Sequence, residues 1–170
     1  MERKNAWLSY GEADETAMEK LAKDYRAFLD AGKTERECVT ELVREAEANG
    51  YVNLETKLAA GEKIQPGDKV YAVGMKKIMA LFHVGQEPLE KGMNILGAHI
   101  DSPRLDVKQN PLYEDTDLAY LDTHYYGGIK KYQWAAIPLA LHGTVAKKDG
   151  TTVNITCLLY TSDAADDLIG

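Results

Sequence analysis

The segment from Asn94 to Ile100 constrains the fold of this chain more than any other part of the sequence. It is a nearly continuous apolar run, and a short run of this kind is typical of a strand that is covered on both faces. Its apolar members are Ile95, Leu96, Ala98 and Ile100. Pro103 disfavours a helical residue before it, so a break is expected just after the run. We therefore predict a buried strand here, within an α/β domain.

A histidine and an aspartate stand at the end of this run. Residues i and i+2 of an extended chain point to the same side, so His99 and Asp101 are expected to face the same way. A carboxylate beside a neutral imidazole fixes the tautomer and orientation of the ring, and this arrangement is common at metal sites. The same pair also fits a second interpretation, in which the two side chains only cap the turn after a solvated strand end.

The residues around the pair read Gly97-Ala-His-Ile-Asp-Ser-Pro-Arg-Leu-Asp-Val-Lys-Gln109. This block resembles the first metal-binding motif of the M18 family of zinc aminopeptidases, which includes aspartyl aminopeptidase and aminopeptidase I. Five further blocks resemble bacterial members in the order of the family: residues 5–8, 25–29, 32–37, 67–71 and 121–134. The resemblance extends over roughly residues 1–156.

The resemblance implies a role for two residues. The histidine of the motif binds one zinc ion of a two-metal centre, and the aspartate is the catalytic residue that braces it, so we expect His99 to be a metal ligand and Asp101 to be catalytic. The implied reaction removes N-terminal residues from peptides with a metal-activated water, and cobalt or manganese replaces zinc in some relatives. The other ligands and the general base are expected beyond Thr156. Substrate-binding residues are therefore unassigned, and the chain by itself is expected to be inactive.

The implied fold is an α/β peptidase domain interrupted by an inserted, strand-rich dimerisation domain. We expect residues 1–104 to form the N-terminal part of the catalytic domain and residues 105–156 to begin the inserted domain. The inserted domain implies that the full-length protein is a homo-oligomer. Six aromatic residues crowd the second region, which fits either an interface or ordinary sheet packing. They are Tyr113, Tyr120, Tyr125, Tyr126, Tyr132 and Trp134.

Local patterns predict individual elements. Apolar residues at helical spacing predict a helix over residues 12–30. A second helix is expected after Thr34, which forms a capping box with Glu37, and it should end before Gly50. Strands are predicted over 69–73, 78–84 and 153–155, with a hairpin turn over 147–150.

The segment Cys157–Asp167 does not resemble the family and resembles one reading frame of a transposase-type sequencing adaptor. We expect residues 157–170 to be foreign to the fold and the chain to be an N-terminal fragment. Cys38 is then the remaining cysteine and is predicted to be a buried small hydrophobe. One cysteine cannot form an internal disulfide, which fits a reducing cytoplasm.

Charge and motifs exclude several function classes. The formal net charge is −7, and three aspartates lie in the expected foreign tail, so the remainder carries −4. A mildly acidic chain argues against nucleic acid or an anionic membrane as a partner. No secretory signal, membrane-spanning run or phosphate-binding loop is visible, so no nucleotide cofactor is expected.

Two other functions remain open. The chain could be a non-catalytic binding or assembly module in which His99 is idle, or part of a related zinc deacylase. An aminopeptidase would need a bridging aspartate, a Glu-Glu pair and a distal histidine further along the protein. Of the other histidines, His83 and His142 fit structural positions, and His124 lies in a family-like block without an assigned role.

Overall fold

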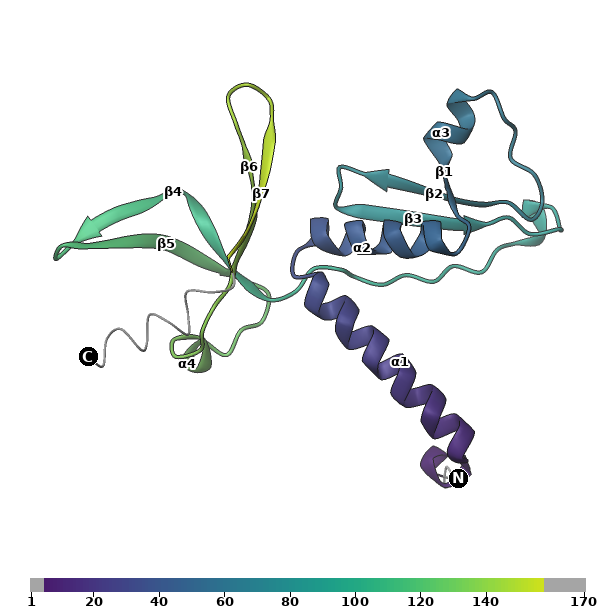
Figure 1. The fold of residues 1–170 in the computed structure, drawn as a ribbon, viewed down its shortest axis with the longest axis horizontal. Coiled ribbons are helices and arrows are strands. Elements are labelled where there is room, and N and C mark those ends of the chain that lie inside the picture. The colour runs from purple at the N-terminus through teal and green to yellow at the C-terminus, as the bar shows by residue number, and fades with distance from the viewer. Residues whose placement is uncertain (1–4, 158–170) are drawn as a thin grey trace. The chain divides into compact units, whose positions relative to one another are not determined.

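The computed structural model describes residues 5–157, and the chain divides into two compact units, Met1–Ile100 and Asp101–Gly170. The first unit combines helices with a three-stranded sheet, and the second consists mainly of two hairpins (Figure 1). The expected mixed α/β class is confirmed. None of the helices among the described residues is long and apolar enough to cross a bilayer.

Helix α2 of the first unit begins as its sequence predicts. The Thr34 side chain accepts a hydrogen bond from the Glu37 backbone N–H at 3.3 Å, and the Glu37 carboxylate accepts one from the Thr34 N–H at 2.9 Å. This reciprocal pair satisfies two amide groups that the first helical turn leaves open. The helices of the unit are η1 (Ala6–Ser9), α1 (Glu12–Ala31), α2 (Glu35–Ala48), α3 (Leu54–Ala59) and η2 (Leu89–Lys91).

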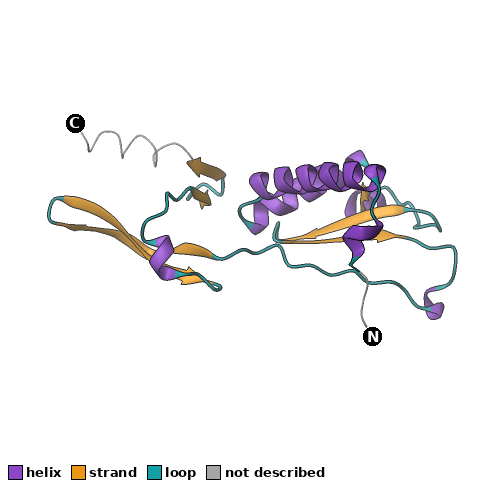
Figure 2. Cartoon of the chain, turned by 90° about the horizontal axis from the view of Figure 1, so that it is seen from below, coloured by secondary structure: helices purple, strands orange, loops and turns teal. Residues whose placement is uncertain are grey.

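The sheet of the first unit has the order β1-β2-β3. Its strands are β1 (Val52–Asn53), β2 (Lys69–Gly74) and β3 (Ile78–His83), with β1 parallel and β3 antiparallel to β2. The predicted strands at 69–73 and 78–84 are thus confirmed. Helix α2 lies along one face of the sheet (Figures 1 and 2), and the core forms between them. The buried hydrophobic residues are Cys38, Val39, Ala46, Val70 and Tyr71.

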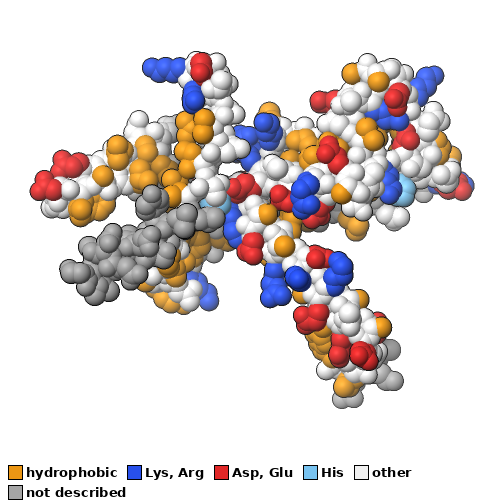
Figure 3. Space-filling model, in the orientation of Figure 1, with side chains coloured by type: hydrophobic (Ala, Val, Ile, Leu, Met, Phe, Trp, Pro, Cys, Tyr) orange, Lys and Arg blue, Asp and Glu red, His pale blue; other side chains and the backbone are white. Residues whose placement is uncertain are grey.

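Helix α1 is confirmed, although much of its apolar face remains uncovered. Leu21 keeps 70% of its surface exposed, and Tyr25 and Leu29 are also exposed. Hydrophobic side chains lie among charged ones along this helix in Figure 3. The amphipathic spacing thus predicts the helix correctly, although its apolar face has no complete partner surface among residues 5–157.

The predicted strand over residues 94–100 is wrong for this structure. The segment has no regular secondary structure and pairs with no strand among the described residues. Leu96 is fully exposed and Ile95 is 80% exposed. A strand needs a neighbour for its backbone groups, and an apolar pattern alone cannot supply one.

The second unit begins with the longest hairpin, which the sequence did not predict as such. Strand β4 (Arg104–Asp115) pairs antiparallel with β5 (Leu118–Tyr126), and the register shifts between Val107 and Leu112. Thr116 and Asp117 form the two-residue turn with φ angles of 52° and 62°. Two positive φ angles suit the right-handed twist of a hairpin.

A second hairpin follows the short helix α4 (Lys131–Trp134). It consists of β6 (Leu141–Ala146) and β7 (Thr152–Cys157), paired antiparallel. The turn is closed by the Lys147 N–H, which donates to the Thr151 carbonyl at 2.8 Å. The strand predicted over 153–155 and the preceding turn are confirmed.

Two predicted boundaries remain predictions. The expected domain boundary after Arg104 lies close to the division between the units, but the identity of residues 105–156 as a dimerisation domain is not established by the fold. Cys157, the first residue of the expected foreign tail, is the last residue of β7. The remainder of that tail, residues 158–170, lies outside the described residues.

Candidate metal site

His99 lies in the irregular segment between η2 and β4, where its side chain is exposed. The next residue, Ile100, is held within the first unit by a contact with Cys38 on helix α2. The Cys38 thiol donates to the Ile100 carbonyl at 3.6 Å and lies 3.4 Å from the Gly32 carbonyl. The histidine is thus adjacent in sequence to a residue held by the buried side of α2.

Burial raises the pKa of the Cys38 thiol, and the negative charges of Glu37 and Glu35 raise it further. The thiol therefore stays protonated at neutral pH and can act as the donor in these contacts. Cys38 is 5% exposed, as predicted for a small buried hydrophobe.

Asp101, the other member of the motif, belongs to the second unit and is partly buried. Its Oδ2 accepts a hydrogen bond from the Tyr126 hydroxyl at 2.8 Å. Tyr126 is the last residue of β5 and pairs in register with Arg104, the first residue of β4. The open end of the hairpin therefore holds the aspartate.

Arg104 supports the tyrosine in this arrangement. Its guanidinium carbon lies 4.2 Å from the centre of the Tyr126 ring, and its Nε donates to the Asp106 carboxylate at 2.7 Å.

Gly127 follows Tyr126 in the chain and has a φ of 72°, and a Cβ at this position would come within 3.3 Å of the Pro103 Cα. The glycine thus permits the close approach of the chain next to Asp101.

The division between the two units falls between Ile100 and Asp101, so His99 and Asp101 belong to different units. Among residues 5–157, no cluster of three or more histidine, cysteine or acidic side chains is placed to hold a metal ion. A zinc ion in a protein takes three or four protein ligands. The imidazole of His99 fits one of these positions, and the described side chains do not form a complete site.

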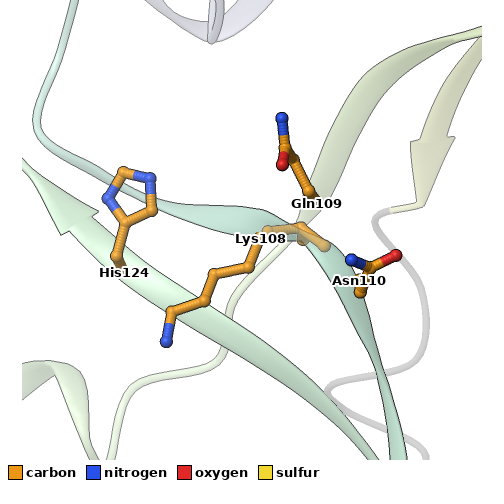
Figure 4. Close-up of a pocket in the computed structure, with 5 residues that line it drawn as sticks. Lys108, Gln109, Asn110 and His124 are labelled. Carbon is orange, nitrogen blue, oxygen red and sulfur yellow. The ribbon is translucent and has the colours of Figure 1, made fainter.

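His124 lies at a different place on the hairpin. The register shift in β4 opens a shallow hollow of about 500 Å³, lined by Val107, Lys108, Gln109, Asn110 and His124. Figure 4 shows Lys108 and Gln109 leaving the strand in opposite directions there. The ammonium group of Lys108 forms an ion pair with Asp122 at 2.9 Å. Neither His99 nor Asp101 lines this hollow.

The sequence profile of the family described as "Aminopeptidase I zinc metalloprotease (M18)" matches residues 28–164. The chain belongs to the M18 family. The matched range contains both His99 and Asp101, and the family expected from the motif is confirmed. It also includes residues 157–164 of the segment that was expected to be foreign.

Individual M18 proteins match most of this chain. A probable M18 family aminopeptidase 1 from Clostridium acetobutylicum is 58% identical over 154 residues, which are 91% of this chain and 33% of the relative. The crystal structure of aminopeptidase I from Borrelia burgdorferi B31 is 37% identical and superposes with a TM-score of 0.83, covering 90% of this chain and 37% of that one. The crystal structure of aminopeptidase I from Clostridium acetobutylicum has a TM-score of 0.77 and covers 92% of this chain and 34% of that one. The chain therefore spans about a third of the length of these M18 relatives.

The sequence motif pointed to His99 and Asp101 but did not predict the contacts that Tyr126 and Cys38 make beside them. Tyr126 lies 25 positions from Asp101, and Cys38 lies 62 positions from Ile100. Tyr126 belongs to the block of six aromatic residues between Tyr113 and Trp134 that the sequence shows. Nothing in that block identified the aspartate as the partner, because the contact depends on the hairpin register.

Proposed function

We propose that the whole protein is a zinc aminopeptidase that removes N-terminal residues from peptides, with His99 as a metal ligand and Asp101 as a catalytic residue. The observation that carries this proposal is the family match across residues 28–164, which includes the His99-x-Asp101 motif. The names of the similar proteins, such as the probable aminopeptidase from Clostridium acetobutylicum, support the same activity.

The two residues would have different roles: His99 would bind the metal, and Asp101 would orient the His99 ring. The neutral His99 imidazole would donate a nitrogen lone pair to zinc. The Asp101 carboxylate would hold the ring in one orientation and raise its basicity, and its own position is held by the Tyr126 hydroxyl. Zinc, when bound, supplies a water molecule of lowered pKa for hydrolysis, and cobalt or manganese would serve as substitutes.

The setting and assembly of the protein form part of the proposal. A reducing cytoplasm fits the free thiols of Cys38 and Cys157. A homo-oligomer built through the strand-rich second unit fits the exposed aromatic side chains of β4 and β5. Peptides would be the substrates.

The experiment requires the remainder of an M18 protein. Residues 1–156 of this chain would replace the aligned part of the Clostridium acetobutylicum relative, to which the chain is 58% identical. We expect the purified chimera to release amino acids from aminoacyl-nitroanilides, to lose this activity with a chelator and to regain it with zinc. Hydrolysis of N-acyl amino acids without aminopeptidase activity would instead indicate a deacylase.

Two variants of the chimera test the residue roles. His99→Ala should lower both zinc content and turnover, because that metal loses a ligand. Asp101→Asn should keep most of the zinc and lower turnover by about 10- to 100-fold, because it removes the charge that steadies the ligand. His83→Ala, at the exposed end of β3, is the matched histidine control. Full zinc occupancy and normal turnover in His99→Ala would contradict the assignment.

A further inference from the structure

We propose that Tyr126 is a positioning residue for the catalytic carboxylate of Asp101. This inference rests on the proposed aminopeptidase function and adds a residue from the second unit to its machinery. The hydroxyl of Tyr126 donates to Asp101 Oδ2 at 2.8 Å, which is the ordinary length of an O–H···O hydrogen bond.

The bond restricts the motion of the carboxylate. An aspartate side chain rotates about two bonds, and its terminal torsion is broad unless a partner fixes it. A donor on Oδ2 selects one orientation of the carboxylate plane and thereby sets the direction in which the other oxygen points. Orienting a ligand in this way is the function that carboxylates beside metal-binding histidines perform.

Tyr126 is itself held in place. The register of β4 and β5 sets it opposite Arg104, and the guanidinium group lies over its ring at 4.2 Å. Asp106 in turn holds Arg104 through a contact of 2.7 Å. A donor that is already ordered loses little conformational freedom when it binds the carboxylate, so it positions Asp101 more effectively than a mobile side chain.

Tyr125 provides a matched comparison on the same strand. Neighbouring side chains of a strand point to opposite faces, and the Tyr125 ring instead contacts the Lys131 ammonium group at 4.3 Å. Tyr125→Phe and Tyr126→Phe remove the same hydroxyl group from adjacent positions. Only the second substitution removes the hydrogen bond to Asp101.

In the chimera, Tyr126→Phe should lower kcat by about 10-fold while KM and zinc content remain near those of the unsubstituted chimera, since the tyrosine acts through Asp101. Tyr125→Phe should leave all three unchanged. Incorporation of 4-aminophenylalanine at position 126 restores a donor and should recover much of the lost kcat. An unchanged kcat in Tyr126→Phe, or a fall in kcat that follows a loss of zinc, would overturn the inference.

A second measurement uses the chain as it stands and does not depend on catalysis. The carboxyl ¹³C resonance of Asp101 should move on Tyr126→Phe and stay in place on Tyr125→Phe, because the resonance responds to the loss of the hydroxyl donor. An unmoved resonance in Tyr126→Phe would overturn the inference even if the chimera is active. An inactive unsubstituted chimera with a shifted resonance would count against the proposed function, while the Tyr126 contact would stand.

Discussion

Cys38 shows how burial alters the chemistry of a single side chain in this chain. The thiol belongs to a residue of α2 and lies next to Gly32, where a Cβ would come within 2.8 Å of its sulfur. Its pKa lies above the ordinary value of 9.0 because burial and two nearby glutamates disfavour the thiolate. The thiolate is the reactive form, so the folded unit should protect this cysteine from alkylation.

We therefore expect Cys38 to react with iodoacetamide at pH 8 at least about 10-fold more slowly in the folded chain than in denaturant. A Cys157→Ser background isolates the signal, which mass spectrometry can follow. Because the folded pKa is raised, the stability that this thiol contributes is present below pH 9.0 and is lost as the pH rises through the folded value. Equal alkylation rates in the folded and unfolded chain would show that the folded unit does not shield the sulfur.

At the scale of elements, the start of α2 is the feature that the sequence predicts best. The capping box joins Thr34 to Glu37, three residues later, so both partners of the interaction are visible in a short stretch of sequence. The same applies to β2 and β3, whose turn lies within a few residues of both strands. Interactions between residues that are close in the sequence can therefore be predicted from the sequence alone.

The cap gives a stability prediction. Thr34→Ala should lower the free energy of unfolding of the first unit by about 1 kcal/mol, because the Glu37 backbone N–H loses its acceptor. Thr40→Ala, in the exposed middle of α2, removes a comparable hydroxyl and should be neutral or slightly stabilising. Urea unfolding followed by circular dichroism would measure both. A Thr34→Ala variant as stable as Thr40→Ala would show that the box contributes nothing.

Two elements could not be predicted from local pattern. The β4–β5 hairpin turns at Thr116 and Asp117, where the usual Asn-Gly signal is absent and a β-branched residue adopts a positive φ. The segment 94–100 has the opposite problem, since its apolar pattern fits a strand but no neighbouring strand pairs with it among the described residues. Strand formation depends on partners that a local window does not contain.

At the scale of the whole molecule, the candidate site was only partly predictable. The motif places His99 and Asp101 two residues apart, which any reading of the sequence shows. Tyr126 contacts Asp101 only because the β4–β5 register brings position 126 back beside position 104. A long-range pairing of this kind follows from the fold and could not be derived from the residue order.

The chain alone should lack aminopeptidase activity. It spans about a third of the length of its M18 relatives, and His99 offers one of the several ligands that a zinc centre needs. We expect no release of nitroaniline from aspartyl, glutamyl or leucyl substrates in the presence of zinc, cobalt or manganese. The chimera, assayed under the same conditions, is the positive control. Chelator-sensitive release by the chain alone would contradict this expectation.

The peptide bond between Ile100 and Asp101 joins two residues that are anchored separately. Cys38 holds the carbonyl of Ile100 within the first unit, and Tyr126 holds the side chain of Asp101 within the second unit. Each of the two neighbouring residues therefore has an anchor in its own unit, so a substitution that removes one anchor leaves the other in place.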